Sequence, residues 1–442
     1  MRSVLHALVL AMSLAVLPAC QDSAKTDSST DAQDRPTGTG TPIWSHAITG
    51  KYVIGHAVTV APSGDIAAAG YASGPIGVAG GLTVPPAIAE DGLFVVGLGP
   101  EAKFRFGVHF GESRIWDKGG IASDSQGNVL VAGTVIGWSD FGAGPIAPVG
   151  SNDVLVVKLS PTGQVLWVRT FPGAPKADGR AVAVDDANNI YVAGEFIGSI
   201  DFGTDAHVGA GNVFLLKLSS GGDVLWSKTF PGMNPQHVRS IAVDDTGDVV
   251  IAGSFYDSID FGSTVLNSAG DTDTFIAKIS KNGEPRFALR FGSKLHEEAP
   301  DLAIDDRGNI FLTAAFSGDL DFGGELLSAP GGFYLAKFDP HGQPLFARKY
   351  VGEVSPRITV DSAGHVLLGG ALDGVFLAKF APDGQLLWNH RWGKAFQAAH
   401  GIAVDAHGNG FVTGSFIEEL EFDGNALAGG PGRTGFILKV SP

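Results

Sequence analysis

Residues 181–203 read AVAVDDANNIYVAGEFIGSIDFG, and two closely similar stretches follow at 240–262 and 302–323. The copies lie about sixty residues apart, and a recurrence at a nearly fixed spacing predicts a repeat architecture. In such an architecture, each copy is a small unit whose apolar face is covered only when its neighbours stack against it. This recurrence excludes most folds before any other property of the chain is considered.

Each unit contains four short apolar runs that are broken by Gly, Asp and Asn. Runs of this length, rich in β-branched residues and bounded by turn residues, are typical of β-strands. Third runs such as FVVGLGP, FLLKLSSGG and FILKVSP recur in every unit. Four strands in each of seven units predict an all-β fold, a seven-bladed β-propeller with four-stranded blades. The seven turns that follow the first runs fall near Ser63, Ser125, Ala187, Thr246, Arg307, Ala363 and His407.

The two ends of the repeat region complement each other. The last unit stops at GFILKVSP, after its third run, whereas the stretch PIWSHAIT near the N-terminus matches the fourth-run pattern VLWVRTF. We expect this N-terminal strand to complete the last blade, because such a closure removes the exposed sheet edges at the join. The predicted propeller covers residues 43–442.

Residues 1–19 have the order of an export signal. Arg2 precedes an apolar run from Val4 to Val16, which is too short to span a bilayer comfortably. The four residues Leu17-Pro18-Ala19-Cys20 resemble the bacterial lipobox, and this resemblance implies that Cys20 is lipidated and becomes the mature N-terminus. An ordinary signal peptide that carries an unrelated cysteine is the alternative.

Residues 20–42 are polar, rich in Ser, Thr, Asp and Gly, and have no apolar periodicity. We predict that they form a flexible tether between the lipid and the propeller. Gln21, and not an aspartate, follows the cysteine, which in the lipoprotein pattern implies the outer membrane. The expected location is therefore the bacterial cell envelope, with the chain anchored through its N-terminal lipid.

The charge of the chain limits its partners. The formal net charge is −16, which argues against nucleic acid, because phosphate binding needs a basic face. Cys20 is the single cysteine, so an intrachain disulfide cannot form and the fold must be stabilised by packing.

Three stretches of the chain resemble a known repeat. LWVRTF at 166–171, AVAVDDANNIYVAGEFIG at 181–198 and FLLKLSSGGDVLW at 214–226 are similar to the bacterial SBBP-type β-propeller repeat. The resemblance covers nearly all of residues 43–442, although the first unit departs from it with VAPSGD in place of the usual VDxxGN. It implies a propeller fold and a surface location, and it brings no single chemistry.

Several repeated residues have a structural interpretation and a functional alternative. We expect the recurring acids to form tight turns, with a ring of calcium sites as the alternative. We expect the phenylalanines of the DFG-like group, such as Phe202 and Phe261, to fill the space between blades. The recurring tryptophans Trp44, Trp167, Trp226 and Trp388 are interpreted as packing residues, with a carbohydrate platform as the alternative. The acids of the first-run turns are Asp185, Asp244, Asp305, Asp361 and Asp405.

The variable loops indicate where a ligand would bind. The connections from fourth to first strands and from second to third strands share one face, and they vary in length and sequence. Basic residues recur on this side, just before the first strands, and they suggest an anion site at the mouth of the channel. Pairing of these residues with acids such as Asp178, Glu297 and Glu298 is the alternative. The candidate ligand-binding residues are His56, Arg180, Arg239, Arg357 and His400.

The chain contains no recognisable catalytic motif, and we expect no cofactor and no metal site. The leading hypothesis is a monomeric, non-enzymatic surface lipoprotein whose variable-loop face binds a protein or a glycan. One alternative is a propeller enzyme, either a quinoprotein-like oxidoreductase or a carbohydrate-active hydrolase or lyase. A second alternative is a scaffold for envelope assembly.

Overall fold

The computed structural model describes residues 39–442, apart from 79–81, 116–119, 296, 325 and 351–355. The regular elements of these residues are β-strands, paired antiparallel, which confirms the predicted all-β class. None of the described residues forms a helix long and apolar enough to cross a membrane. Cys20, the predicted export signal and most of the predicted tether lie outside the described residues.

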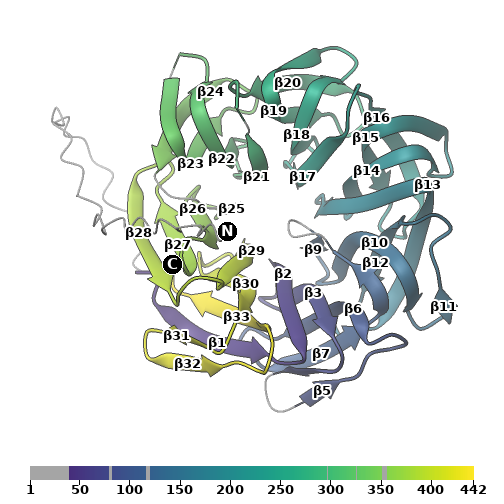
Figure 1. Ribbon diagram of the computed structural model, residues 1–442, viewed down its shortest axis with the longest axis vertical. Coiled ribbons are helices and arrows are strands. Elements are labelled where there is room, and N and C mark those ends of the chain that lie inside the picture. The colour runs from purple at the N-terminus through teal and green to yellow at the C-terminus, as the bar shows by residue number, and fades with distance from the viewer. Residues whose placement is uncertain (1–38, 79–81, 116–119, 296, 325, 351–355) are drawn as a thin grey trace, which may run out of the picture. The chain divides into compact units, whose positions relative to one another are not determined.

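The sheets of residues 39–442 surround a common centre (Figure 1), and the strands nearest to it include β2, β9, β17, β21, β25 and β29. Five sheets have four strands each, and chain order is also spatial order in four of them. The sheet that follows the N-terminal strand contains β2 (Tyr52–Val60), β3 (Ile66–Ser73), β6 (Asp91–Leu98) and β7 (Phe104–His109). The next four-stranded sheet along the chain contains β17 (Gln236–Val243), β18 (Val249–Asp260), β19 (Val265–Ile279) and β20 (Pro285–Phe291).

Two more sheets repeat this pattern. One contains β21 (Glu298–Ile304), β22 (Ile310–Asp321), β23 (Leu326–Phe338) and β24 (Pro344–Tyr350). The other contains β25 (Arg357–Val360), β26 (Val366–Ala371), β27 (Val375–Phe380) and β28 (Leu386–Trp392). Because the connections are short and antiparallel, each sheet is built from one continuous piece of chain.

A nine-stranded sheet covers the two units between β7 and β17. The two units form one sheet because they share the long strand β13. Its first half pairs with β12, and its second half pairs with β14. The strands of the first of these two units, before β13, are β8 (Gly111–Arg114), β9 (Ile121–Ser123), β10 (Val129–Asp140), β11 (Pro145–Ile146) and β12 (Asp153–Leu159). The long strand and the second group are β13 (Val165–Val184), β14 (Ile190–Asp201), β15 (Ala206–Leu218) and β16 (Val224–Phe230).

Both ends of the described chain belong to one sheet. This sheet contains β29 (Ala398–Val404), β30 (Gly410–Phe416), β33 (Thr434–Val440) and β1 (Pro42–Ile48). The N-terminal strand β1 pairs antiparallel with β33, with Ile48 opposite Gly435. Thr41 already bonds to Ser441, so the pairing begins before residue 43. Two short hairpins extend the ring, β4 (Ile76–Val78) with β5 (Leu82–Val84) and β31 (Glu419–Phe422) with β32 (Asn425–Ala428).

The phenylalanines of the DFG-like group fill the contacts between neighbouring units. Phe202 is 2% exposed, and its ring lies 5.3 Å from that of Phe171, the aromatic residue that ends the previous unit. The same pairing recurs between Phe261 and Phe230, whose centroids are 4.9 Å apart. Aromatic pairs of this kind bury large apolar areas and prefer tilted arrangements. They form the outer part of the apolar core between the sheets.

An aspartate closes the first-run turn in every unit except the first. In the turn at Asp305, one carboxylate oxygen accepts hydrogen bonds from the backbone N–H groups of Arg307 and Asn309. Gly308 has φ 76°, a left-handed conformation that favours glycine. The other carboxylate oxygen, Oδ2 of Asp305, accepts a hydrogen bond from the side-chain amide of Asn309. These contacts explain the D-x-x-G-N pattern by turn formation.

In every unit except the first, a lysine on the third strand is paired with the turn aspartate, and in five of these units its ammonium also donates to the backbone of the next unit. Lys278 lies 2.7 Å from the carboxylate of Asp244, and its ammonium also donates to the carbonyl of Pro340 in the following sheet. Burial alone would raise the pKa of Asp244, but hydrogen bonds from Lys278 and Thr246 hold it below its usual value. The equivalent pairs are Lys158–Asp124, Lys217–Asp185, Lys337–Asp305, Lys379–Asp361 and Lys439–Asp405.

The recurring tryptophans also lie between units. Trp167 and Trp226 are half-buried, and their indole N–H groups donate to the carbonyls of Ser220 and Lys281 in the next unit. Gly222 lies directly beneath the Trp167 ring, where a β-carbon would come within 3.1 Å of it. These contacts support the packing interpretation, because the rings face neighbouring backbone and not an open platform.

Candidate functional site

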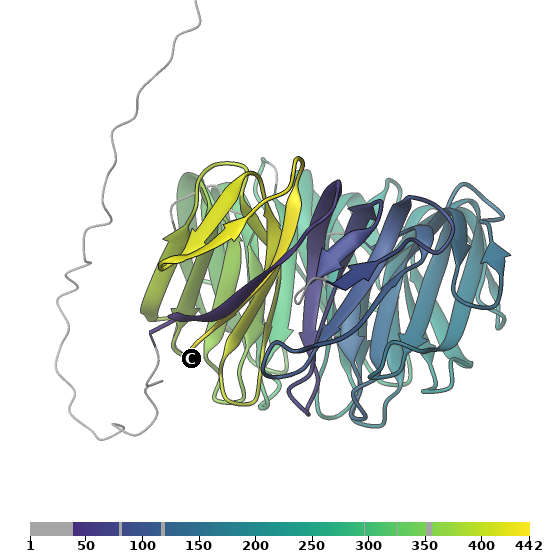
Figure 2. The same cartoon turned by 90° about the horizontal axis from the view of Figure 1, so that it is seen from below.

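The ring has two chemically different faces. Figure 2 shows them edge-on, with the yellow β31–β32 hairpin at one face and the C-terminus toward the other. The uniform D-x-x-G-N turns lie at the face of the C-terminus, and the connections between units lie at the opposite face. We call the latter the variable-loop face. Its loops include 231–235, 292–295 and 393–397 between units, together with the insertions between second and third strands.

The predicted basic residues sit at a distinctive place on the inner strands. Four of them fall where the pairing register between first and second strands shifts by one residue, which is a β-bulge. A bulge inserts one unpaired residue and re-aims its side chain, and bulges are over-represented next to functional sites. The fifth residue, Arg357, begins β25 and pairs regularly with Gly369. The four bulge residues are His56 in β2, Arg180 in β13, Arg239 in β17 and His400 in β29.

The structure brings three of these residues together. The rings of His56 and His400 lie 6.0 Å apart, across the junction of the first and last sheets. Arg357 Nε donates a 2.6 Å hydrogen bond to the backbone carbonyl of His400. Arg180 and Arg239 lie on the neighbouring inner strands β13 and β17.

Arg180 belongs to a buried group of charges. Asp178 is completely buried and lies 3.6 Å from Arg180 and 2.9 Å from Lys176. Its Oδ1 accepts hydrogen bonds from the Asn152 amide at 2.8 Å and from the Thr134 hydroxyl at 3.3 Å. This arrangement agrees with the alternative expectation, in which the basic residues pair with acids that include Asp178.

Two further members of this group could not be identified from the sequence. Arg180 forms a close ion pair with Glu195 of β14, which lies fifteen positions further along the chain. Arg114 of β8 interacts electrostatically with both Asp178 and Arg180. Burial is the main reason that the pKa of Arg114 lies below its usual value. Both residues come from other strands, and the sequence carries no spacing that would reveal them.

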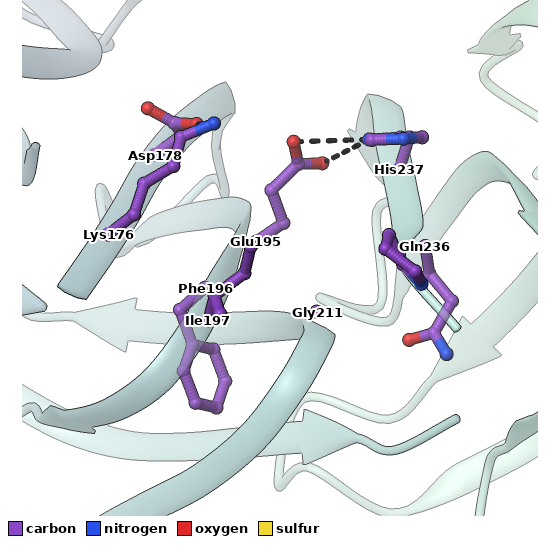
Figure 3. Close-up of a pocket in the computed structure, with 9 residues that line it drawn as sticks. Lys176, Asp178, Glu195, Phe196, Ile197, Gly211, Gln236 and His237 are labelled. Carbon is purple, nitrogen blue, oxygen red and sulfur yellow. Dashed lines mark hydrogen bonds and ion pairs between the residues drawn. The ribbon is translucent and has the colours of Figure 1, made fainter. Parts of the chain in front are cut away.

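Glu195 joins this group to the next sheet. Its two carboxylate oxygens each lie 3.2 Å from Nδ1 of His237, which projects from β17 (Figure 3). Glu195 is 8% exposed, whereas the His237 side chain is 38% exposed. The carboxylate therefore connects a buried arginine to a histidine at the surface.

A small cavity opens beside these residues at the variable-loop face. It has a volume of about 60 Å³ and lies between β13, β14 and β17. We call it the Gln236 pocket. Charged groups line one side and apolar side chains the other. The lining residues are Lys176, Asp178, Glu195, Phe196, Ile197, Gly211, Pro235, Gln236 and His237.

The acidic groups of this pocket have basic partners. Its carboxylates are already paired with Lys176, Arg180 and His237. Among the residues that the structure describes, no group of three His, Cys, Asp or Glu side chains could hold a metal ion. In the first-run turns of Asp244 and Asp124, a lysine ammonium is paired with the carboxylate oxygen that a calcium ion would need as a ligand.

Arg239 differs from Arg180 in its surroundings. Arg180 pairs with Glu195 of β14, whereas the residue of β18 that corresponds to Glu195 is Ser254. Within the described residues Arg239 forms no ion pair, and its buried Nε has no hydrogen-bond partner. The anion site predicted from the sequence stays a prediction, and Arg239 is the residue that supports it best.

Comparisons with known proteins support the fold. No protein-family model matches the chain. The regulatory protein FlaEY of Caulobacter vibrioides is 26% identical over 206 residues, which are 43% of this chain and 21% of that protein. The uncharacterized WD repeat-containing protein L264 of Acanthamoeba polyphaga mimivirus is 24% identical over 160 residues, which are 30% of this chain and 11% of that protein. The chain thus matches less than a quarter of the length of either relative.

A solved structure is similar over almost the whole chain. A chain in the crystal structure of a mitotic checkpoint complex has a TM-score of 0.50 at 10% identity, covering 98% of this chain and 99% of that chain. At this identity the likeness concerns the fold alone. Together with the ring of antiparallel sheets, it identifies the chain as a β-propeller repeat protein. The resemblance to the SBBP-type repeat stays a prediction.

The unequal pairing of the two arginines can be tested by substitution. Arg180→Met removes a cation from Glu195 and from buried Asp178, so it should lower the free energy of unfolding by about 3 kcal/mol. Arg239→Met breaks no ion pair among the described residues and should cost less than about 1 kcal/mol. Equilibrium urea unfolding of both variants gives these values. Equal losses would contradict the assignment of Arg180 to a structural ion-pair group.

Proposed function

We propose that this chain is a seven-bladed β-propeller that binds a protein partner on its variable-loop face and has no enzymatic role. Each blade would have four strands, with β1 completing the last blade. The strand pairing supports this count. The first half of β13 pairs with β12 and its second half pairs with β14, so the nine-stranded sheet would be two blades, in addition to the five four-stranded sheets.

Exposed apolar side chains on the variable loops carry this proposal. Val149, Met233 and Phe396 are 81%, 79% and 78% exposed, and they come from three different connections of this face. Phe396 has φ 70°, a left-handed conformation that is unfavourable for a bulky residue. Large apolar and aromatic side chains held in solvent are the anchors that protein interfaces use.

The opposite face is less suited to recognition. Its turns are uniform, and the aspartate and lysine of each turn are already engaged with neighbouring units. A glycan platform is disfavoured because Trp167 and Trp226 lie half-buried between units. We therefore favour a protein over a glycan as the partner.

Site-specific photocrosslinking in the native host tests the proposal. A benzophenone amino acid at Met233 or Phe396 should give discrete adducts of higher mass. The same amino acid at Leu225 or Leu345, apolar residues that are 49% and 55% exposed near the turns of the opposite face, should give none. Adducts of equal yield from both pairs, or from neither, would contradict a partner-binding variable-loop face.

We further propose that the chain is exported, lipidated at Cys20 and attached to the outer membrane through the tether. The apolar run that ends in LPAC supports this proposal. Cells fed with an alkyne-labelled fatty acid should incorporate label into the wild-type chain and not into Cys20→Ser. Equal labelling of the two proteins, or a wild-type chain without label, would remove the lipoprotein assignment.

A further inference from the structure

Two distant segments of the chain together reproduce one turn of the repeat. In the second unit, the connection from third to fourth strand reads KLSPTGQVLW at 158–167. In the last unit, β33 leads into KVSP at 439–442, and the segment that leads into β1 reads TGTPIW at 39–44. Placed end to end, these two segments repeat the Lys, the Ser-Pro-Thr-Gly turn and the Trp of the second unit. Pro442 and Thr39, however, are not joined by a peptide bond.

The hydrogen bonds of the continuous turn are present across this break. In the continuous turn, the Ser160 N–H donates to the Gln164 carbonyl at 2.8 Å, and the Gln164 N–H donates to the Ser160 hydroxyl at 3.1 Å. Across the break, the Ser441 N–H donates to the Thr41 carbonyl at 2.9 Å, and the Thr41 N–H donates to the Ser441 hydroxyl at 3.1 Å. The two segments therefore have the geometry of a turn from which one peptide bond is missing.

The glycine of the turn also keeps its place. Gly163 and Gly40 both have a left-handed backbone conformation, with φ 82° and 71°. Gly163 lies against the ring of Phe106 in the preceding unit. Gly40 lies against the ring of Trp388 in the unit of β25–β28, where a β-carbon would come within 2.7 Å of the ring. The interrupted turn is thus packed on its neighbour like a continuous one.

Continuous turns also supply an acceptor to the preceding unit. In the turn that begins at Ser219, the second residue is Ser220. Its carbonyl accepts hydrogen bonds from the Lys158 ammonium at 3.1 Å and from the Trp167 indole N–H at 3.2 Å. These two bonds connect the third and fourth strands of one unit to the turn of the next.

This acceptor is not used at the break. The equivalent donors are Lys379 and Trp388, in the unit of β25–β28. Within the described residues, the buried Nε1 of Trp388 has no hydrogen-bond partner. The Lys379 ammonium lies 3.4 Å from the carbonyl of Gly408, which belongs to a different turn of the last unit. Neither donor therefore bonds to Pro442, the second residue of the interrupted turn.

The junctions on the other side of β1 lack the lysine contact as well. Lys439 of the last unit pairs with Asp405 at 3.8 Å, and within the described residues its ammonium donates no hydrogen bond to the first unit. The first unit has Gly97 at the position of the lysine, so it makes no such contact with the second unit. The regular contact is therefore missing on both sides of the last unit and on the far side of the first.

We infer that β1 is the detachable strand of the ring, so that the ring opens first by release of β1 from β33. The other fourth strands follow their third strands through a covalent turn, whereas β1 is held at this end by hydrogen bonds. Proteins open locally at free energies below that of global unfolding, and segments with few contacts open first. The interrupted turn and the missing lysine contacts place this local opening at β1.

Release of β1 changes the junction between the last unit and the first. Ile48 of β1 packs in one apolar cluster with Val53 of the first unit and Phe411 of the last. The rings of His56 and His400 lie 6.0 Å apart across the same junction. Opening therefore uncovers the edge of β33, which is a template for another strand, and loosens the place where two candidate ligand-binding residues meet.

Hydrogen exchange of the full chain, followed by mass spectrometry, tests this inference. Peptides that cover β1 are compared with peptides that cover β20, a fourth strand that follows a continuous turn. We expect the protection factors of β1 to be lower by about tenfold or more, because β1 exchanges through its own opening. Protection of β1 equal to that of β20 would overturn the inference.

Two equivalent serines give a matched pair of variants. Ser441→Ala removes the hydroxyl that accepts from Thr41 across the break, and Ser280→Ala removes the hydroxyl that accepts from Glu284 at 3.0 Å in a continuous turn. Ser441→Ala should lower the protection of β1 about fivefold, the effect of one hydrogen bond. Ser280→Ala should leave the protection of β1 unchanged, because release of β1 does not break the turn at Ser280.

The variants separate local opening from global unfolding. If both substitutions lower the protection of β1 equally, β1 exchanges only when the whole ring unfolds, and the inference is wrong. If Ser441→Ala leaves the protection of β1 unchanged, the interrupted turn does not hold the strand, and the inference is wrong as well. These measurements involve neither a partner nor the lipid, so their failure is distinguishable from failure of the proposed function.

Discussion

The contact of a third-strand lysine with a turn aspartate and with the next unit's backbone is the interaction on which the ring depends. Lys278 shows its parts: an ion pair of 2.7 Å with Asp244 and a hydrogen bond of 3.2 Å to the carbonyl of Pro340. The hydrophobic effect that holds the sheets together has no preferred direction, whereas a buried ammonium needs its partners at fixed positions. The repeated lysines therefore fix the register between consecutive units, and the aromatic pairs fill the space around them.

The first unit shows what happens where this contact is absent. Ala61 stands at the place of the turn aspartate, and Gly97 stands at the place of the lysine. Both members are missing together, as expected if neither is useful alone, because a lone buried charge is costly. The unit instead pairs Asp65 with Arg105 at 2.8 Å, near the surface. The junctions of this unit are thus held by packing and by contacts nearer the centre, such as that between His56 and His400.

Positions that repeat could be predicted from the sequence, and contacts that occur once could not. The turn aspartates, the phenylalanines of the DFG-like group and the variable loops recur, so a single sequence reveals them. Glu195, Arg114 and His237 act once and across different strands, and their proximity follows only from the sheet order. The bulges that hold Arg180 and Arg239 depend on pairing register, which is not visible in the spacing of apolar residues. The third-strand lysines were visible as a repeated KLS-like pattern, but their role needs the position of the next unit.

Substitution of Lys278 tests the central claim most directly. Lys278→Met leaves Asp244 buried without its cation and removes the contact to the next unit. Equilibrium urea unfolding should therefore show a loss of about 3 kcal/mol. Lys228→Met, which affects a 41% exposed lysine 3.5 Å from Glu284, is the matched control and should cost less than about 1 kcal/mol. A Lys278→Met protein as stable as this control would contradict the claim that buried lysines hold the ring together.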